Sequence, residues 1–163
     1  MSAIFERTSV RKYQNKEVEA EKVEQILRAA MAAPSAANQQ PWEFYVVKKK
    51  ETLVALAEKS PYGSFIKDAA LAIVPVYRKE LMMPEFAEID MAACTQNMLL
   101  EVTELGLGAV WVGVAPLTDR MESVRQILRI PEHLNPYGII PIGYPVADAE
   151  QKERYDATRV HFE

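Results

Sequence analysis

Residues 85–105 constrain the fold most, because their pattern predicts a long helix that is apolar on more than one face. The apolar residues of this segment are Ile89, Met91, Cys94, Met98, Leu99, Leu100, Val102 and Leu105. A helix with so little polar surface is usually buried on several sides. In a chain of 163 residues a second copy of the chain could cover one of those sides. We therefore expect this helix at the core of a homodimer.

Shorter helices and strands alternate around this segment. Helical spacing of apolar residues predicts further helices at 19–32, 51–59 and 118–128. Runs rich in β-branched and aromatic residues predict strands at 42–47, 71–77, 109–114 and 137–144. Pro75 interrupts the second strand and suggests a sheet edge or a bulge, and Gly106 can end the long helix in a left-handed cap. The pattern predicts an α+β fold, in a single domain over residues 1–163, with helices that flank a mixed sheet.

Charge and cysteine content exclude several classes of partner. The net charge is −4 and no long basic block is present, so we expect no nucleic-acid partner. No apolar run is long enough to span a bilayer and no signal-peptide pattern opens the chain, so we expect no membrane partner. The single cysteine excludes an intrachain disulfide and favours a reducing cytoplasm. The two histidines, His133 and His161, lack metal-ligand spacing, and we expect no metal site.

A polar segment near the start, Arg7-Thr8-Ser9-Val10-Arg11, spaces two guanidinium groups four residues apart around two hydroxyls. Arginine offers a rigid fork of donors that suits a phosphate or the carbonyl edge of a ring. The alternative is a solvated basic turn before a helix.

A second polar segment runs from Ala33 to Trp42 between a predicted helix and a predicted strand. Pro34 and Pro41 push the residue before each of them towards an extended conformation. Ser35 and Asn38 lie between the prolines among small residues, which let a ligand approach the backbone closely. The alternative is a polar connector with turn chemistry. Together the two segments suggest a site for a flat, hydrogen-bonding ligand that carries a phosphate.

These segments resemble the flavin-binding signature of the nitroreductase family. That family has Arg-x-Ser-x-Arg/Lys followed by an aromatic residue, matched at 7–13, and Ala-Pro-Ser-x-x-Asn-x-Gln-Pro-Trp, matched at 33–42. A helix-Gly-x-Gly-strand element at 104–113 and a strand with a Gly-Tyr-Pro turn at 139–145 follow in the family's order. The resemblance implies a nitroreductase-like fold with a mixed, mainly antiparallel sheet. It also implies an intertwined homodimer with two interface flavin sites, each built from both chains.

The resemblance also implies which residues bind FMN. They are Arg7, Thr8, Ser9, Arg11, Pro34, Ser35, Ala36, Asn38, Gly113, Val114, Lys152 and Arg154. The first four would hold the phosphate, the polar chain and the pyrimidine end of the ring, although the family varies at the position of Thr8. The residues at 34–38 would come from the other subunit, and the backbone at 113–114 would approach the flavin N5. A simple turn glycine fits Gly113 equally well.

The pair Lys152 and Arg154 resembles a Lys-x-Arg element that completes the phosphate clamp, with Arg154 preferred for its fork geometry. A surface mixture of lysine, glutamate and arginine is the alternative.

The resemblance implies an FMN-dependent oxidoreductase that takes a hydride from NADH or NADPH. It would reduce an electron-poor small molecule, such as a nitroaromatic compound or a quinone, by a ping-pong mechanism. The flavin would carry the chemistry, tuned by Arg11, and no side chain is required as a catalytic acid or base. Two alternatives stay open: a flavin-binding or flavin-modifying protein without NAD(P)H turnover, and a structural or interaction domain without flavin. The compact stretch 78–88, where relatives often carry lid structure, leaves the acceptor open.

Overall fold

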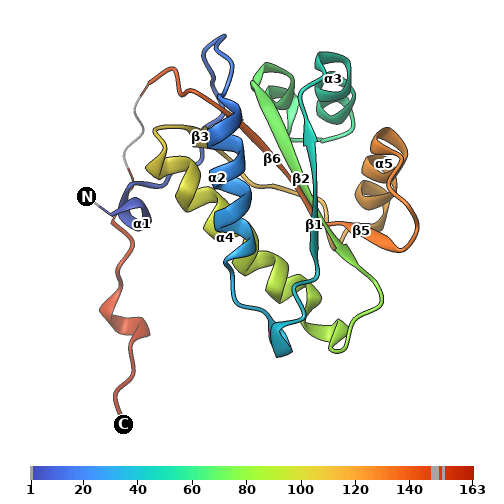
Figure 1. Cartoon of the computed structure of the whole chain (residues 1–163). Helices are drawn as coiled ribbons and strands as arrows, with labels where there is room; N and C mark the ends of the chain where they lie inside the picture. The colour runs from blue at the N-terminus through green and yellow to red at the C-terminus, as the bar shows by residue number, and fades with distance from the viewer. Residues whose placement is uncertain (1, 148–150, 152) are drawn as a thin grey trace.

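The sheet lies between two groups of helices in the computed structural model, which describes residues 2–147, 151 and 153–163 (Figure 1). The strands are β1 (Trp42–Val47), β2 (Leu71–Arg78), β3 (Gly108–Ala109), β4 (Val112–Gly113), β5 (Leu134–Pro136) and β6 (Gly138–Gly143). The order β1-β2-β6-β3 is antiparallel throughout, with β5 paired to β2 and β4 paired to β6. A parallel bridge between Ser9 and Ala109 makes the sheet mixed. The predicted α+β class with a mixed, mainly antiparallel sheet is confirmed.

The helices cover both faces of this sheet. They are α1 (Ala3–Glu6), α2 (Ala20–Met31), α3 (Lys50–Glu58), α4 (Ala87–Glu104) and α5 (Thr118–Leu128). The side chains of β2 alternate between two cores. Leu71 and Ile73 pack with α2 and α4, whereas Ala72 and Val74 pack with α3 and α5. A central strand covered on both faces explains why β2 reads as a continuous apolar run.

The long helix α4 confirms the helix predicted at 85–105. It ends as expected, because Gly106 adopts a left-handed φ of 69°. Cys94 is buried on α4, and burial raises the pKa of its thiol to about 12, so the side chain packs rather than reacts. Ile89 lies on the same helix and is 63% exposed, which leaves apolar surface of α4 uncovered in a single chain.

The segment predicted as one strand at 109–114 forms two short strands, β3 and β4. Both pair with β6 in one register, since Gly108 faces Gly143 and Val112 faces Ile139. The same register places Pro141 opposite the break at Val110. Proline has no N–H to donate to the ladder, and the pairing is interrupted there.

Of the two alternatives predicted at Pro75, the sheet edge is wrong and the bulge is confirmed. Val76 faces Pro136 but Ile73 faces Ile140, so the segment opposite β2 contains one extra residue at this point. The strand β2 has β1 on one side and β5 and β6 on the other. The Pro75 carbonyl accepts a hydrogen bond of 3.0 Å from the backbone N–H of Tyr137, which lies between β5 and β6. Proline is tolerated in this central strand because its missing N–H faces the junction of two short strands.

Candidate functional site

The segment 7–13 lies along β3 as an additional strand. The Val10 N–H donates to the Ala109 carbonyl over 2.9 Å, and Tyr13 forms a bridge with Pro145. The Tyr13 hydroxyl lies 2.7 Å from the Val10 carbonyl oxygen and 3.2 Å from the Pro141 carbonyl oxygen of β6, and burial raises its pKa well above the ordinary value. A neutral tyrosine therefore fastens the segment to the sheet.

Two glycines allow this close packing. A Cβ atom at Gly108 would lie 2.7 Å from the Cβ of Val10, and one at Gly143 would lie 3.0 Å from the Tyr13 ring. Glycine in a strand often marks such an approach of another chain segment. The position of the segment therefore depends on the absence of side chains at 108 and 143.

Side chains alternate along this extended segment. Thr8 and Val10 line one pocket together with Gly106 and Pro145. Arg11 instead lines a different cavity, and Ser9 is exposed. Arg7 is half-buried. The predicted residues of the first motif are thus divided between two sides of one strand, with Ser9 and Arg11 opposite Thr8.

The cavity beside Arg11 also contains Gly113 and Val114, so the structure brings together predicted residues from two distant motifs. Its lining residues are Arg11, Lys59, Ser60, Pro61, Tyr62, Phe65, Val110, Trp111, Val112, Gly113, Val114, Arg120 and Val124. The lining contains three cations and no carboxylate. The Arg11 side chain is exposed, and its guanidinium lies over the Phe65 ring at 5.8 Å from the centroid, a cation–π contact that favours this orientation.

The backbone at Gly113 forms an open part of this cavity wall. Its carbonyl accepts a hydrogen bond of 3.1 Å from Nη1 of Arg120. A Cβ atom at Gly113 would meet no atom within 4 Å, so the space above this backbone is open. A flat ligand can approach the main chain there.

The loop that contains the second motif connects α2 to β1 and has an unusual backbone. Ala37, Asn38 and Gln40 have φ values of 48°, 53° and 45°, which are left-handed for residues other than glycine. Such residues cost about 1–3 kcal/mol each and persist where surrounding contacts impose them. The Ser35 hydroxyl oxygen accepts from the Gln40 N–H at 3.0 Å, and Oδ1 of Asn38 accepts from Nε2 of Gln40 at 2.9 Å.

A buried carboxylate on α4 holds this loop, and sequence reasoning missed it. Asp90 accepts from the Ala36 N–H at 2.9 Å and from Nε2 of Gln39 at 2.7 Å. Gln39 in turn accepts from the Met83 N–H and donates to the Met83 carbonyl. Arg78 donates to the backbone carbonyls of Gln39 and Gln40. The available signal was a single acidic residue between Ile89 and Met91 in a helix predicted to be buried.

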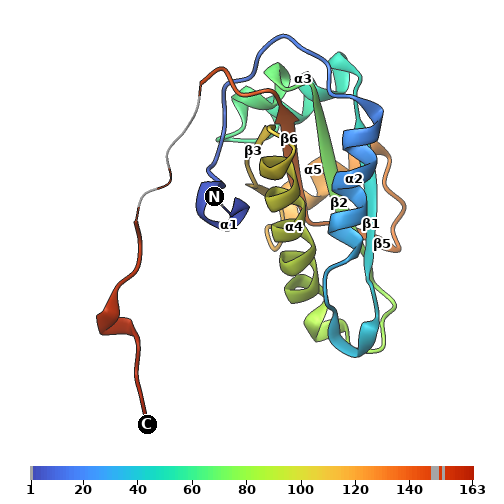
Figure 2. The same ribbon diagram turned by 60° about the vertical axis from the view of Figure 1, so that its left-hand side comes forward.

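A single chain does not bring the two motifs together. The segment 7–13 lies near α1 and β3, whereas the loop 34–40 lies at the far end of α2 (Figures 1 and 2). Among the described residues no hydrogen bond or ion pair joins them. Arg11 with Gly113 therefore forms one part of the predicted site, and Ser35 with Asn38 forms another.

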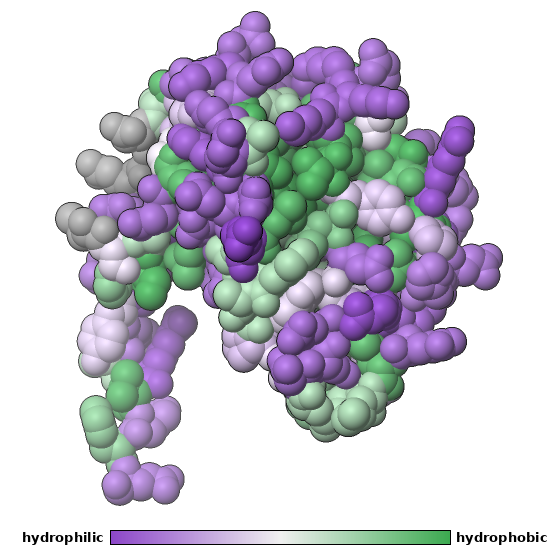
Figure 3. Space-filling model, viewed as in Figure 1, coloured by the Kyte–Doolittle hydropathy of each residue, from purple (hydrophilic) through white to green (hydrophobic). Residues whose placement is uncertain are grey.

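The C-terminal segment stands away from the body of the chain (Figure 2). Arg154 is exposed on it, and its backbone N–H donates to the Glu153 carboxylate at 2.9 Å. Lys152 lies outside the described residues. The segment carries exposed apolar residues among hydrophilic ones, with Phe162 93% exposed (Figure 3). The structure therefore does not bring Arg154 to the other predicted phosphate ligands within one chain.

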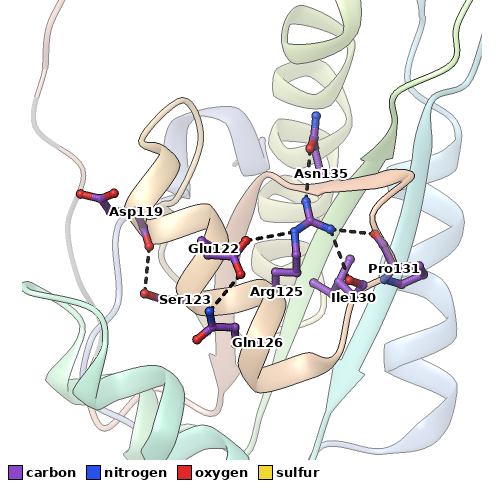
Figure 4. Close-up of polar contacts among 8 residues, drawn as sticks. All are labelled: Asp119, Glu122, Ser123, Arg125, Gln126, Ile130, Pro131 and Asn135. Atoms are coloured by element: carbon purple, nitrogen blue, oxygen red, sulfur yellow. Dashed lines mark hydrogen bonds and ion pairs between the residues drawn. The ribbon is translucent and has the colours of Figure 1, made fainter.

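A second cluster of polar residues lies at α5, and its contacts explain it without a ligand. Arg125 donates to the carbonyls of Ile130 and Pro131 and approaches Glu122 and Asn135 (Figure 4). The guanidinium thus ties the end of α5 to the chain that follows. Throughout the described ranges no three His, Cys, Asp or Glu side chains gather as a metal site requires. No helix there has the length and apolar run needed to cross a bilayer.

The fold and the site define an α+β protein with a cationic cavity beside an added N-terminal strand. The sequence model of the nitroreductase family matches residues 4–80 and 57–144, and the chain belongs to that family.

Individual relatives of known sequence or structure agree with this family assignment. A protein from Methanothermobacter thermautotrophicus, provisionally described as an NADH dehydrogenase/NAD(P)H nitroreductase, is 44% identical over 164 residues, covering 100% of this chain and 86% of the relative. The crystal structure of a provisionally described NADH oxidase from Clostridium acetobutylicum has a TM-score of 0.96 at 42% identity, with 99% of each chain covered. A provisionally described nitroreductase from Desulfovibrio desulfuricans, solved in complex with FMN, has a TM-score of 0.84 at 30% identity. That match covers 99% of this chain and 94% of the other.

Proposed function

We propose that this chain is an FMN-dependent oxidoreductase that takes a hydride from NAD(P)H and reduces an electron-poor acceptor, such as a nitroaromatic compound or a quinone. The observation that carries the proposal is the cavity where Arg11 faces the open backbone at Gly113. Membership of the nitroreductase family and the FMN complex of the Desulfovibrio relative support it. The single cysteine favours the cytoplasm as its location.

The residues present fit a flavin. Gly113 leaves open the space that a side chain would fill, so a ring can approach its backbone. In the described part of the chain, Nδ2 of Asn38 has no hydrogen-bond partner, and the Ser35 hydroxyl donates to none. These groups are free to donate to a ring edge.

The chain's own residues would hold and tune the cofactor. Arg7 would bind the phosphate, while Ser9 and Thr8 would contact the polar chain. Arg154 or Lys152 would complete the phosphate clamp. Arg11 would lie at the pyrimidine end of the ring, and the backbone at 113–114 would face N5. FMN, when bound, supplies the capacity to accept a hydride from the donor and to pass electrons to the acceptor.

Positive charge is the main contribution of the protein to this chemistry. Arg11, Lys59 and Arg120 line the cavity without a carboxylate among the lining residues. Reduction places negative charge on the pyrimidine end of the flavin, and fixed cations there stabilise that charge. The donor and the acceptor would use the same open face in turn, which gives ping-pong kinetics. Evidence for a ternary complex of enzyme, NAD(P)H and acceptor would contradict that mechanism.

A homodimer would complete the site. Pro34, Ser35, Ala36 and Asn38 lie far from Arg11 in one chain, so a second chain would supply them. The exposed apolar surface of Ile89 on α4 and of Phe162 on the C-terminal segment is consistent with burial against that second chain.

Cofactor retention tests the proposal most directly. The purified protein is incubated with excess FMN, desalted and examined by visible absorption. We expect a retained flavin spectrum that bleaches anaerobically with NADH or NADPH. A retained flavin that neither donor bleaches would favour a flavin-binding protein without turnover. Absence of binding in a titration would contradict the proposal.

Mixed dimers test the shared site. Arg11→Ala should slow reduction by NAD(P)H about tenfold or more and weaken FMN binding less, because it removes charge stabilisation. Asn38→Ala should weaken FMN binding. A dimer with one Arg11→Ala chain and one Asn38→Ala chain should recover about half of the wild-type rate, because one of its sites contains neither substitution. No recovery would show that both residues serve a site within one chain. Arg28→Ala, which removes an exposed ion pair with Glu24, is the control.

A further inference from the structure

We propose that Asp90 is a positioning residue that sets the conformation of the flavin-binding loop 34–40. The inference rests on the proposed function, since the loop would contact the flavin only in that case. Asp90 would not touch the cofactor itself. It acts through Ala36 and Gln39, which lie on either side of Asn38 in the loop.

The burial of Asp90 is the first argument. The residue is 4% exposed, and the described part of the chain contains no lysine or arginine paired with it. Burying a carboxylate costs free energy unless hydrogen bonds compensate. Each of its oxygens accepts one hydrogen bond from the loop, and its place in the first turn of α4 favours negative charge. An apolar residue would pack there without this cost. The hydrogen bonds to the loop therefore explain why a carboxylate occupies this position.

The strain of the loop is the second argument. Three left-handed residues other than glycine within 37–40 would relax if nothing held them. The contacts of Asp90 fix the loop at Ala36 and at Gln39, and Asn38 lies between these two points. The free donors of Ser35 and Asn38 therefore keep a set direction before any ligand binds, and less ordering remains to be done on binding.

The polarity of the network requires an acid at position 90. Gln39 uses its Oε1 for the Met83 N–H and its Nε2 for the Met83 carbonyl, which fixes the orientation of its amide. Nε2 therefore points to Asp90 as a donor, and the Ala36 N–H is a second donor. An asparagine at 90 has one acceptor and would place its own N–H₂ group against one of these donors.

The test compares Asp90→Asn with wild type by FMN titration and by hydrogen exchange of the apoprotein. We expect the Kd for FMN to rise about tenfold or more, because a buried donor loses its partner. Amide exchange in 35–40 should accelerate, while exchange in the core strands stays unchanged. Asp119→Asn, an exposed acid in the first turn of α5, is the matched control.

A reciprocal exchange separates positioning from general stability. In the double variant Asp90→Asn/Gln39→Glu the donor and the acceptor trade places, and the Met83 N–H keeps its acceptor. FMN affinity should recover in part relative to Asp90→Asn, although the Met83 carbonyl loses its donor. If Asp90→Asn does not fold, Gln39→Met removes the loop side of the contact without altering α4, and the same loss of affinity is expected.

These experiments distinguish a failure of the inference about Asp90 from a failure of the proposed function. A Kd within about twofold of wild type, with unchanged loop exchange, overturns the inference, and so does a double variant that binds no better than Asp90→Asn. If wild type itself binds no FMN, the proposed function fails. The exchange rates of 35–40 in the apoprotein then decide alone whether Asp90 holds the loop.

Discussion

The two parts of the proposed site are built in different ways within the same chain. The segment 7–13 is held by main-chain pairing with β3 and by close packing on Gly108 and Gly143. The loop 34–40 is held by the side chains of Asp90, Gln39 and Arg78. The first part is an extension of the sheet, whereas the second is a strained connector fastened by polar contacts.

Because of this difference, we expect the two parts to differ in the free energy needed to open them. A segment that pairs with a core sheet opens only when much of the structure opens, whereas a loop fastened by side chains can open locally at lower free energy. Substitutions around 7–13 should therefore change the free energy of unfolding together with FMN affinity. Substitutions around 34–40 should change the loop and FMN affinity with less effect on global stability.

Among the substitutions that test this comparison, Gly108→Ala should have the largest effect on stability and on FMN affinity. The new Cβ would lie 2.7 Å from Cβ and Cγ1 and 2.8 Å from Cγ2 of Val10, and rotation of the side chain cannot move the Cβ away. Overpacking of this kind costs about 1–3 kcal/mol, which corresponds to roughly 2–12 °C in melting temperature for a chain of this size. Calorimetry and FMN titration should show both losses together.

A companion variant sharpens this test. Gly108→Ala/Val10→Ala removes the Cγ atoms that clash, and it should regain part of the melting temperature. If Gly108→Ala melts like wild type, close packing of Val10 on the sheet does not hold the segment.

Gly113→Ala is the matched substitution in the cavity wall and should separate binding from stability. No atom lies within 4 Å of the new Cβ, so the free energy of unfolding of the apoprotein should stay within about 1 kcal/mol of wild type. The methyl group would occupy the space proposed for the ring, and the Kd for FMN should rise about tenfold. Unchanged FMN affinity would place the flavin elsewhere.

Much of the fold follows from local patterns in the sequence. The helix at 118–128 and the strand at 42–47 have the predicted bounds. In each segment the spacing of apolar residues fits a single type of secondary structure along its whole length. The break between β3 and β4 was not predictable in this way. It depends on Pro141, which only the register of the sheet places opposite Val110. The choice between an edge and a bulge at Pro75 was not predictable for the same reason, since the bulge lies at a junction contributed by a distant segment.

The site shows the same limit. Arg11 and Gly113 were predicted through a family resemblance, and the structure places both in one cavity. The contacts of Asp90 span 54 and 51 positions of the sequence, and no local pattern indicates them. Motifs identify groups that could touch a ligand, whereas the residues that position those groups depend on tertiary contacts.

A pair of serines gives the smallest and most discriminating prediction. The Ser35 hydroxyl accepts a hydrogen bond from the Gln40 N–H, whereas the Ser9 side chain makes no hydrogen bond in the described structure. Ser35→Ala should therefore accelerate amide exchange at Gln40 in the apoprotein, and Ser9→Ala should leave exchange unchanged at 7–13. Each should raise the Kd for FMN by only about threefold to tenfold, because each would lose one proposed hydrogen bond to FMN, worth about 0.5–1.5 kcal/mol. Equal exchange behaviour of the two variants would remove the distinction between a part built by the sheet and a part built by side chains.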